Sequence, residues 1–154
     1  MGKPKITDKR WSIDLEKRIQ EEHYGESYSS RYSFNPNSAK EIFGIDTPPP
    51  YPSGTWHIGA VAQYSMIDVI ARSQRLLGKE VYFPWGVDRN GINIEFTVEK
   101  KTGKKMRTFE RGEFIDLCKE TIEEYTQAMR ETACRVGLSC SFESEYLTDP
   151  PEYR

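Results

Sequence analysis

The chain has 154 residues, of which 36% are hydrophobic and 30% charged, with a formal net charge of −2. This length fits one domain with a modest core. No apolar run approaches the roughly 20 residues that a membrane-spanning helix needs, and the net charge does not indicate a broadly basic nucleic-acid-binding protein. Residues 1–10 are polar and charged and do not form a secretory leader, so we expect a cytoplasmic protein that does not contact a membrane.

The three cysteines, Cys118, Cys134 and Cys140, are odd in number and lack C-x-x-C spacing. This usage is typical of reduced thiols in a cytosolic protein. The chain also has only two histidines and no close cluster of Cys and His, so we predict no metal site.

The first 39 residues divide into a helix and an arm. A helix is predicted over residues 8–22, with Asp8 as its cap and an apolar repeat of Trp11, Leu15 and Ile19. Residues 23–39 are rich in Tyr, Ser, Asn and Gly, which favours an extended arm that needs another surface to become ordered. A short strand is predicted over 42–45.

Four prolines between Pro48 and Pro52 exclude a helix or a central strand there. The following pattern predicts a helix over residues 55–77, ended by Gly78. One apolar stripe, typical of a buried helix face, comprises Ile58, Ala62, Met66, Val69, Ser73 and Leu76, flanked by Val61, Ile70 and Leu77.

The second half of the chain continues the alternation of strands and helices. We predict a strand over 80–83, broken at residues 84–86, and a helix over 91–101 with Ile94 and Val98 inward and a stop at Gly103. A long helix over 111–136 ends at Gly137, and a last strand covers 141–147. Strands alternating with helices favour an α/β fold with a parallel sheet, of which three strands form about half of a nucleotide-binding fold. An unpartnered edge and face would promote self-association.

The loop before the helix at 55–77 is the main candidate site. Parallel sheets bind ligands outside the carboxyl ends of their strands, which would group Pro49, Tyr51, His57 and Asp88 around one crevice. His57 could donate to a phosphate oxygen, Gly59 allows close approach of a nucleotide, and Asp88 could bind an ammonium group. The alternative is that His57 only caps the helix and the proline run is only a turn. The Gly spacing matches neither a dinucleotide fingerprint nor a P-loop.

A basic cluster surrounds Gly103: Lys100, Lys101, Lys104, Lys105 and Arg107. Such a cluster is usually a solvated loop, and the alternative is contact with phosphate or RNA.

Two long segments carry a family resemblance. The first is Asp46-Thr-Pro-Pro-Pro-Tyr-Pro-Ser-Gly-Thr-Trp-His-Ile-Gly-Ala60, which resembles the first signature, His-Ile-Gly-His, of class I aminoacyl-tRNA synthetases. The second, residues 68–95, resembles the segment that follows it in the members specific for valine, isoleucine and leucine. The Thr-Pro-Pro-Pro run and Asp88-Arg-Asn-Gly91 are most similar to archaeal-type, valine-specific members. The resemblance extends from about Trp11 to Arg154.

The resemblance implies the first half of a Rossmann-like catalytic domain over residues 40–154, preceded by an N-terminal helix and arm over 1–39. The editing insertion, the second half of the fold with its Lys-Met-Ser-Lys-Ser loop, and the anticodon-binding domain are not in this sequence. Lys105-Met-Arg-Thr108 does not match that loop. The implied enzyme activates valine with ATP and Mg²⁺ and transfers it to tRNA(Val). We expect the enzyme to be monomeric when full-length and this segment alone to be inactive.

By the same resemblance, two groups of residues would form the site. The catalytic residue would be His57, with ATP bound by Ser53, Gly54, His57, Gly59 and Ala60. The amino acid would be bound by Pro49, Pro50, Tyr51 and Asp88. Ala60 replaces the second signature histidine, which removes one donor to the ATP phosphates. The alternatives are a leucine- or isoleucine-specific member, or a paralogue that binds an amino acid or nucleotide without activating it.

Overall fold

The computed structural model describes residues 10–23 and 27–153. Within this part the α-helices are α1 Ile13–His23, α2 Ser27–Ser30, α3 Ile58–Leu76, α4 Ile92–Thr102 and α5 Arg111–Val136. The strands are β1 Ile42–Gly44, β2 Glu80–Tyr82, β3 Pro84–Val87 and β4 Ser141–Leu147, and two 3₁₀ turns cover Met106–Thr108 and Pro151–Tyr153. None of the described helices is long and apolar enough to cross a membrane.

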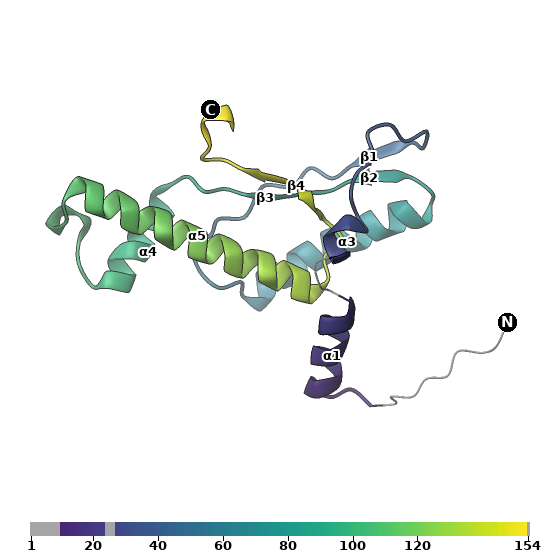
Figure 1. The fold of residues 1–154 in the computed structure, drawn as a ribbon, viewed down its shortest axis with the longest axis horizontal. Helices are drawn as coiled ribbons and strands as arrows, with labels where there is room; N and C mark the ends of the chain where they lie inside the picture. The colour runs from purple at the N-terminus through teal and green to yellow at the C-terminus, as the bar shows by residue number, and fades with distance from the viewer. Residues whose placement is uncertain (1–9, 24–26, 154) are drawn as a thin grey trace.

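The strands form parallel pairs around residues 80–87. β1 pairs with β2 in the register Ile42↔Glu80, and β3 pairs with β4 from Pro84↔Ser141 to Val87↔Leu147 (Figure 1). Two adjacent carbonyls of this segment accept from different neighbouring strands. The Tyr82 carbonyl accepts from the Ile45 amide next to β1, and the Phe83 carbonyl accepts from the Ser141 amide of β4. Successive carbonyls point to opposite sides of a strand, so the spatial order is β1, β2–β3, β4. The expected α/β fold with a parallel sheet is therefore confirmed.

The main core lies between these strands and helices α3 and α5. Every second residue of the central segment is buried, namely Val81, Phe83, Trp85 and Val87. They pack with Tyr64 and Ala71 of α3, Met129 and Ala133 of α5, and Leu138, Cys140 and Phe142. A second, smaller cluster of Ile94, Val98 and Phe114 joins α4 to the first turns of α5.

Several expectations for the chain hold. Helix α5 and strand β4 have the predicted bounds, α4 buries Ile94 and Val98, and α4 and α5 end at Gly103 and Gly137. Both glycines have positive φ, 70° and 80°, which is the left-handed conformation that ends a helix at little cost for glycine.

The break predicted at residues 84–86 is wrong, because β3 spans Pro84–Val87. Proline cannot donate to a ladder, but the register shifts between Pro84 and Gly86, and such an irregularity tolerates a residue without an N–H. Gly86 has a second role at this point. A Cβ atom on Gly86 would lie 2.2 Å from Cζ of Tyr146, so only glycine lets the Tyr146 ring cross the strand here.

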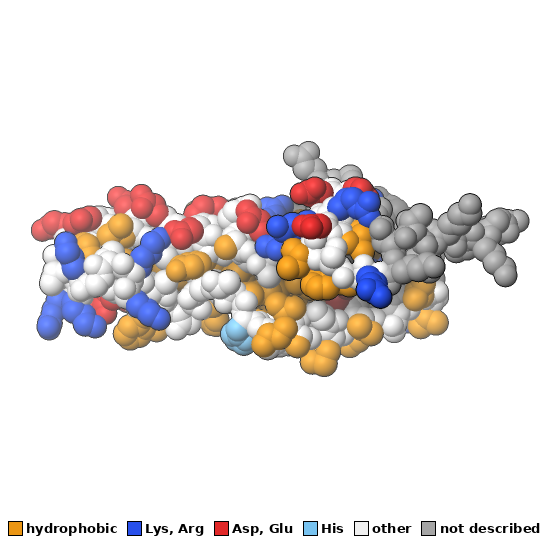
Figure 2. Space-filling view, turned by 90° about the horizontal axis from the view of Figure 1, so that it is seen from below, with side chains coloured by type: hydrophobic (Ala, Val, Ile, Leu, Met, Phe, Trp, Pro, Cys, Tyr) orange, Lys and Arg blue, Asp and Glu red, His pale blue; other side chains and the backbone are white. Residues whose placement is uncertain are grey.

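The predicted apolar stripe of α3 does not face the core. Ile58, Met66 and Leu76 are 82%, 66% and 89% exposed, whereas the buried residues of this helix are Tyr64, Asp68 and Ala71. Figure 2 shows hydrophobic side chains gathered along the lower edge of the molecule in this view. The helix also begins at Ile58 rather than at residue 55.

The N-terminal predictions also need correction. α1 begins at Ile13, with the Ser12 hydroxyl accepting from the Leu15 amide, while the expected cap, Asp8, lies outside the described residues. Trp11 precedes the helix and is 71% exposed. The arm is not simply extended: its buried Tyr28, in α2, donates to the carbonyl of Gly137 and so orders the arm on the body of the protein.

A buried carboxylate, Asp68, ties α3 to the entry of β4. It accepts from the backbone N–H and hydroxyl of Ser139 and, at 2.7 Å, from Nε of Arg72. Arg75, one turn further along α3, donates to the hydroxyl and carbonyl of Ser139 at 2.6 and 2.8 Å. Burial lowers the pKa of this arginine, and Asp68 opposes that shift.

We expect Asp68→Ala to lower the free energy of unfolding by about 2–4 kcal/mol, because the buried Ser139 amide and hydroxyl lose their acceptor. Chemical denaturation measures this change. Glu41→Ala is the matched control: Glu41 pairs with Lys79 at 2.7 Å, but its side chain is 73% exposed, so its loss should cost less than about 1 kcal/mol. Equal effects of the two variants would contradict a structural role for the buried network.

Candidate active site at the carboxyl ends of the strands

The N-terminus of α3 is capped by the side chain of His57. Its Nδ1 atom accepts from the backbone N–H groups of Gly59 and Ala60 at 3.1 and 3.3 Å, and the residue has the extended backbone of a cap, φ −84° and ψ 164°. Two accepted bonds at Nδ1 place the proton of the neutral ring on Nε2. His57 is exposed, so its Nε2–H is a donor turned to solvent at a helix N-terminus.

This cap changes the expected role of the neighbouring glycine. A Cβ atom on Gly59 would lie 3.0 Å from both Cε1 and Nδ1 of His57. A side chain at position 59 would therefore press on the His57 ring where it folds back over the helix end, and glycine avoids this close contact. His57 therefore caps the helix, as the alternative interpretation expected. The cap uses Nδ1 and leaves Nε2 out of the cap.

The proline loop is fixed by its carbonyl groups. The Pro48 carbonyl accepts from the Tyr64 hydroxyl at 3.1 Å, and the Pro50 carbonyl accepts from the Asp88 amide at 2.9 Å. Pro52 is fully buried, while Pro49 and Pro50 are half-buried. Proline has no N–H to satisfy, so a loop anchored through carbonyls suits this sequence.

An aromatic cluster connects the proline loop to the main core. Trp56 stacks on Tyr64 with ring centroids 4.8 Å apart, and Trp85 lies 5.7 Å from Trp56 and 5.5 Å from Phe142. Burial raises the pKa of Tyr64 to about 12, so its hydroxyl stays protonated and keeps donating to the loop at all physiological pH values. These rings come from the segment before α3, from α3 itself and from two strands, which ties the loop to the main core.

Asp88 follows β3 and lies beside this loop. Its Oδ1 atom accepts from the Asn90 amide at 3.1 Å and from the Thr148 hydroxyl at 2.8 Å. A hydrogen bond with Asp88 raises the pKa of the half-exposed Tyr51. Asp88 thus interacts with both Pro50 and Tyr51, while the exposed Ser53 donates from its amide to the Tyr51 carbonyl.

Sequence reasoning missed Thr148 and Asn90. Both have a signal that could have found them: Thr148 follows the last predicted strand, whose carboxyl end lies at the same edge as the end of the strand before Asp88. Asn90 is two residues after Asp88, the spacing at which an aspartate accepts from the backbone.

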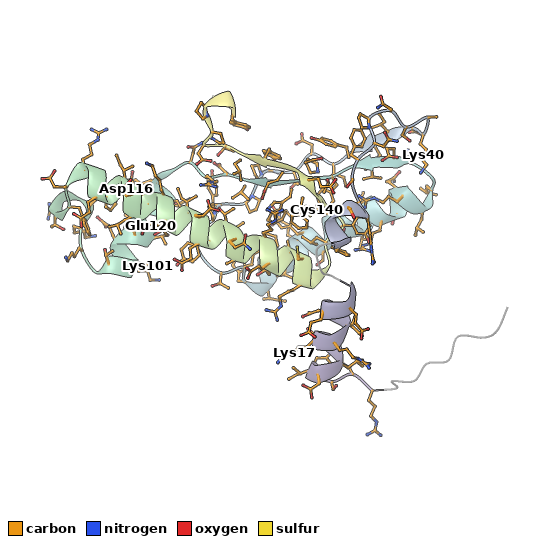
Figure 3. All side chains as sticks on the ribbon, in the orientation of Figure 1. Lys17, Lys40, Lys101, Asp116, Glu120 and Cys140 are labelled. Atoms are coloured by element: carbon orange, nitrogen blue, oxygen red, sulfur yellow. The ribbon has the colours of Figure 1, made fainter. Side chains whose placement is uncertain are left out.

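The cysteines and the basic cluster are the other groups that could carry chemistry. The three cysteines form no disulfide, and burial raises the pKa of Cys140, inside the molecule in Figure 3, to about 12.

In the basic cluster, Lys101 pairs with Glu124 and Lys105 with Glu99, at 2.5 and 2.8 Å. Figure 3 shows Lys101 and the acidic Asp116 and Glu120 on the same α4–α5 hairpin, so the positive charge is partly offset there.

Comparison with known proteins gives the family. The model of class I tRNA synthetases for isoleucine, leucine, methionine and valine matches residues 20–154. Relatives include the valine–tRNA ligase of Archaeoglobus fulgidus, 48% identical over 79% of this chain and 14% of the relative. That of Aeropyrum pernix is 40% identical over 99% of this chain and 19% of the relative.

A solved structure also matches: LeuRS of Agrobacterium radiobacter K84 in a ternary complex with tRNA and LeuAMS. Its TM-score is 0.69 with 26% identity, covering 90% of this chain and 16% of that one. The chain belongs to the class I aminoacyl-tRNA synthetases, and it spans less than a fifth of the length of the relatives it matches. Members of this family use ATP, generally with Mg²⁺.

We expect His57→Ala to reduce the free energy of unfolding by about 1 kcal/mol, because two amides at the start of α3 lose their acceptor. His57→Asn should recover most of this loss, since asparagine is a good cap, but it has no Nε2 donor at the same place. Thermal unfolding of the three proteins measures the effect. If His57→Ala unfolds like the unaltered chain, the hydrogen bonds to Nδ1 do not stabilise the helix.

Proposed function

We propose that this chain is the part of a valine–tRNA ligase that carries the first half of the catalytic domain. The enzyme would activate valine with ATP and transfer it to tRNA(Val). The observation that carries the proposal is the position of Asp88, whose amide donates to the Pro50 carbonyl of the proline loop and whose carboxylate is fixed by Thr148. It is made in a chain 40–48% identical to valine–tRNA ligases. Residues 40–154 would form this half-domain, residues 1–39 its N-terminal arm, and the cytoplasm is where we expect it to act.

The amino acid would lie against the loop. A carboxylate at the end of β3 suits the α-ammonium group, and the half-buried Pro49 and Pro50 with Tyr51 offer an apolar surface to a branched side chain. Prolines lose little conformational entropy on binding, which suits a small ligand with few contacts. Tyr51 would then contact both the ammonium site and the side-chain site.

ATP would lie over the start of α3. The Nε2–H of His57 can donate to a phosphate oxygen, the helix terminus favours negative charge, and Ser53, Gly54, Gly59 and Ala60 border the same turn. The Mg²⁺ that would offset the triphosphate charge binds mainly through phosphate oxygens. That fits the described residues, which contain no group of three or more His, Cys, Asp or Glu able to hold a metal.

Activation needs no nucleophile from the protein. The valine carboxylate attacks the α-phosphorus of ATP, the bond to the β-phosphate oxygen breaks, and pyrophosphate leaves with valyl-adenylate behind. The terminal ribose hydroxyl of tRNA then takes the acyl group and AMP leaves. The residues of this chain act by holding the two reactants and by donating to the phosphates as charge develops.

The first test is calorimetric titration of this chain with the valyl-adenylate sulfamoyl analogue, beside the leucyl and isoleucyl analogues. We expect valine-selective binding that weakens about 10- to 100-fold in Asp88→Asn, because a charge-assisted hydrogen bond is lost. Asp116→Asn, on the distant surface of α5, is the matched control and should bind as the unaltered chain does.

Tighter binding of the leucyl analogue would favour the leucine-specific alternative over the valine-specific one. If none of the analogues binds, the next experiment uses a chimera in which this segment replaces the corresponding residues of the Archaeoglobus fulgidus relative. Valine-dependent exchange of pyrophosphate into ATP then measures whether the chimera activates valine. A chimera that binds valine and ATP but shows no exchange would favour the non-catalytic paralogue.

Ala60 provides a second functional test. Its amide already donates to His57, and its methyl side chain offers no donor to ATP. In the same chimera we expect Ala60→His to raise the rate of pyrophosphate exchange by about 100-fold or more, the usual effect of one well-placed donor. Ala60→Gln, similar in size but different in geometry, is the control. No gain with histidine would mean that another group already serves this phosphate.

A further inference from the structure

The hydroxyl of Thr148 uses its full hydrogen-bonding capacity on the segment that carries Asp88. It accepts from the Arg89 amide at 2.9 Å and from Nδ2 of Asn90 at 3.0 Å, and it donates to Oδ1 of Asp88 at 2.8 Å. A threonine hydroxyl has two acceptor lone pairs and one hydrogen. Because both lone pairs are occupied by N–H donors, the single hydrogen is directed at the carboxylate.

Thr148 is itself well fixed. It is only 6% exposed, it follows directly after β4, and its backbone carbonyl accepts a second bond from Nδ2 of Asn90 at 2.8 Å. The residue therefore joins the end of β4 to the turn after β3, across a sequence separation of 60 residues to Asp88. A bond between two strand ends leaves the carboxylate little freedom to rotate.

These contacts distinguish the two oxygens of Asp88. Oδ1 accepts from the Asn90 amide and from the Thr148 hydroxyl, which occupies its two lone-pair directions. Oδ2 is then the oxygen with capacity for a ligand. Interaction with this carboxylate raises the pKa of Tyr51, which is half-exposed on the proline loop. Tyr51 therefore shares Oδ2 with the ligand, and an oxygen with two lone pairs has room for both.

We propose that Thr148 is a positioning residue that orients the Asp88 carboxylate, so that Oδ2 is presented to the α-ammonium group of the amino acid. This inference rests on the function proposed above. It predicts an effect mainly on binding of the ammonium group, since the Thr148 hydroxyl donates its one hydrogen to the Asp88 carboxylate. A merely structural role would instead affect every ligand of the site, because the whole turn over residues 88–90 would shift.

The test combines two ligands with two variants of this chain. The ligands are the valyl-adenylate sulfamoyl analogue and the same molecule without its amino group. Thr148→Val keeps the shape but removes the hydroxyl, and Thr148→Ser keeps the hydroxyl. We expect Thr148→Val to weaken the amino ligand about 10-fold and the deaminated ligand less than about 2-fold, with Thr148→Ser restoring affinity to within about 3-fold.

Hydrogen exchange of the Arg89 amide gives a readout without ligand. This N–H loses its acceptor in Thr148→Val and keeps it in Thr148→Ser, so exchange should become at least about 10-fold faster only in the valine variant. Unchanged exchange in Thr148→Val would overturn the inference, because the Thr148 hydroxyl would then not bond to the Asp88 turn at all. Faster exchange shows that the bond exists, and the pair of ligands then separates a positioning role from a merely structural one.

The ligand results are equally decisive. Equal weakening of both ligands in Thr148→Val would overturn the inference in favour of a structural role, and no weakening would overturn it directly. If the unaltered chain shows no preference for the amino ligand over the deaminated one, the proposed role of Asp88 fails, and the inference fails with it. That outcome is visible before any Thr148 variant is made, so the two failures are distinguishable.

Discussion

The buried carboxylate of Asp68 is the interaction on which the geometry of this site depends. It lies on the buried face of α3 and accepts from the amide and hydroxyl of Ser139, two residues before β4 begins. One end of α3 carries the His57 cap, and the far end of β4 leads to Thr148. A displacement of α3 relative to β4 would therefore change the relation between the helix terminus and the Asp88 turn. Burying a carboxylate is costly, so this arrangement exists only with all its hydrogen bonds made.

In the Asp88 turn and the proline loop, backbone hydrogen bonds likewise fix the geometry of the site. Prolines supply acceptors and no donors, and the groups that the loop accepts from are Tyr64 of α3 and the Asp88 amide. The loop is thus positioned by one helix and one strand end, both already fixed by the core. A ligand that contacts the loop, Asp88 and the start of α3 meets elements that do not need to be ordered on binding, which reduces the entropic cost of association.

The parts of the fold that could be predicted are those where local signals agree with each other. Helix α5 has a long apolar repeat and a glycine at its end, and β4 follows that glycine closely, so both bounds were right. The apolar stripe of α3 misled, because the helix buries Tyr64, Asp68 and Ala71 and leaves Ile58 and Leu76 exposed. A charged residue paired by Ser139 and Arg72 behaves as a core residue, and no periodicity rule foresees its partners.

For the site, only part of the geometry could be predicted from the sequence. The grouping of Asp88 with Tyr51 was expected from strand ends meeting at one edge, whereas Pro50 was named only through the family resemblance. The use of His57 Nδ1 as a helix cap was only an alternative. Thr148 was missed because its hydrogen bonds join two turns that are 60 residues apart. Strand β3 was missed because proline argues against a strand unless the irregular pairing is known.

The proposed division of labour limits what each residue can contribute to specificity. Every amino acid has an α-ammonium group, so Asp88 and Thr148 would separate amino acids from other acids and could not separate valine from leucine or isoleucine. That choice would fall to Pro49, Pro50 and Tyr51, where one methylene is worth only about 1–3 kcal/mol. A rigid polar contact shared by all substrates would then have a separate use. It would fix the carboxylate of the amino acid relative to ATP, so that different side chains are compared in one orientation.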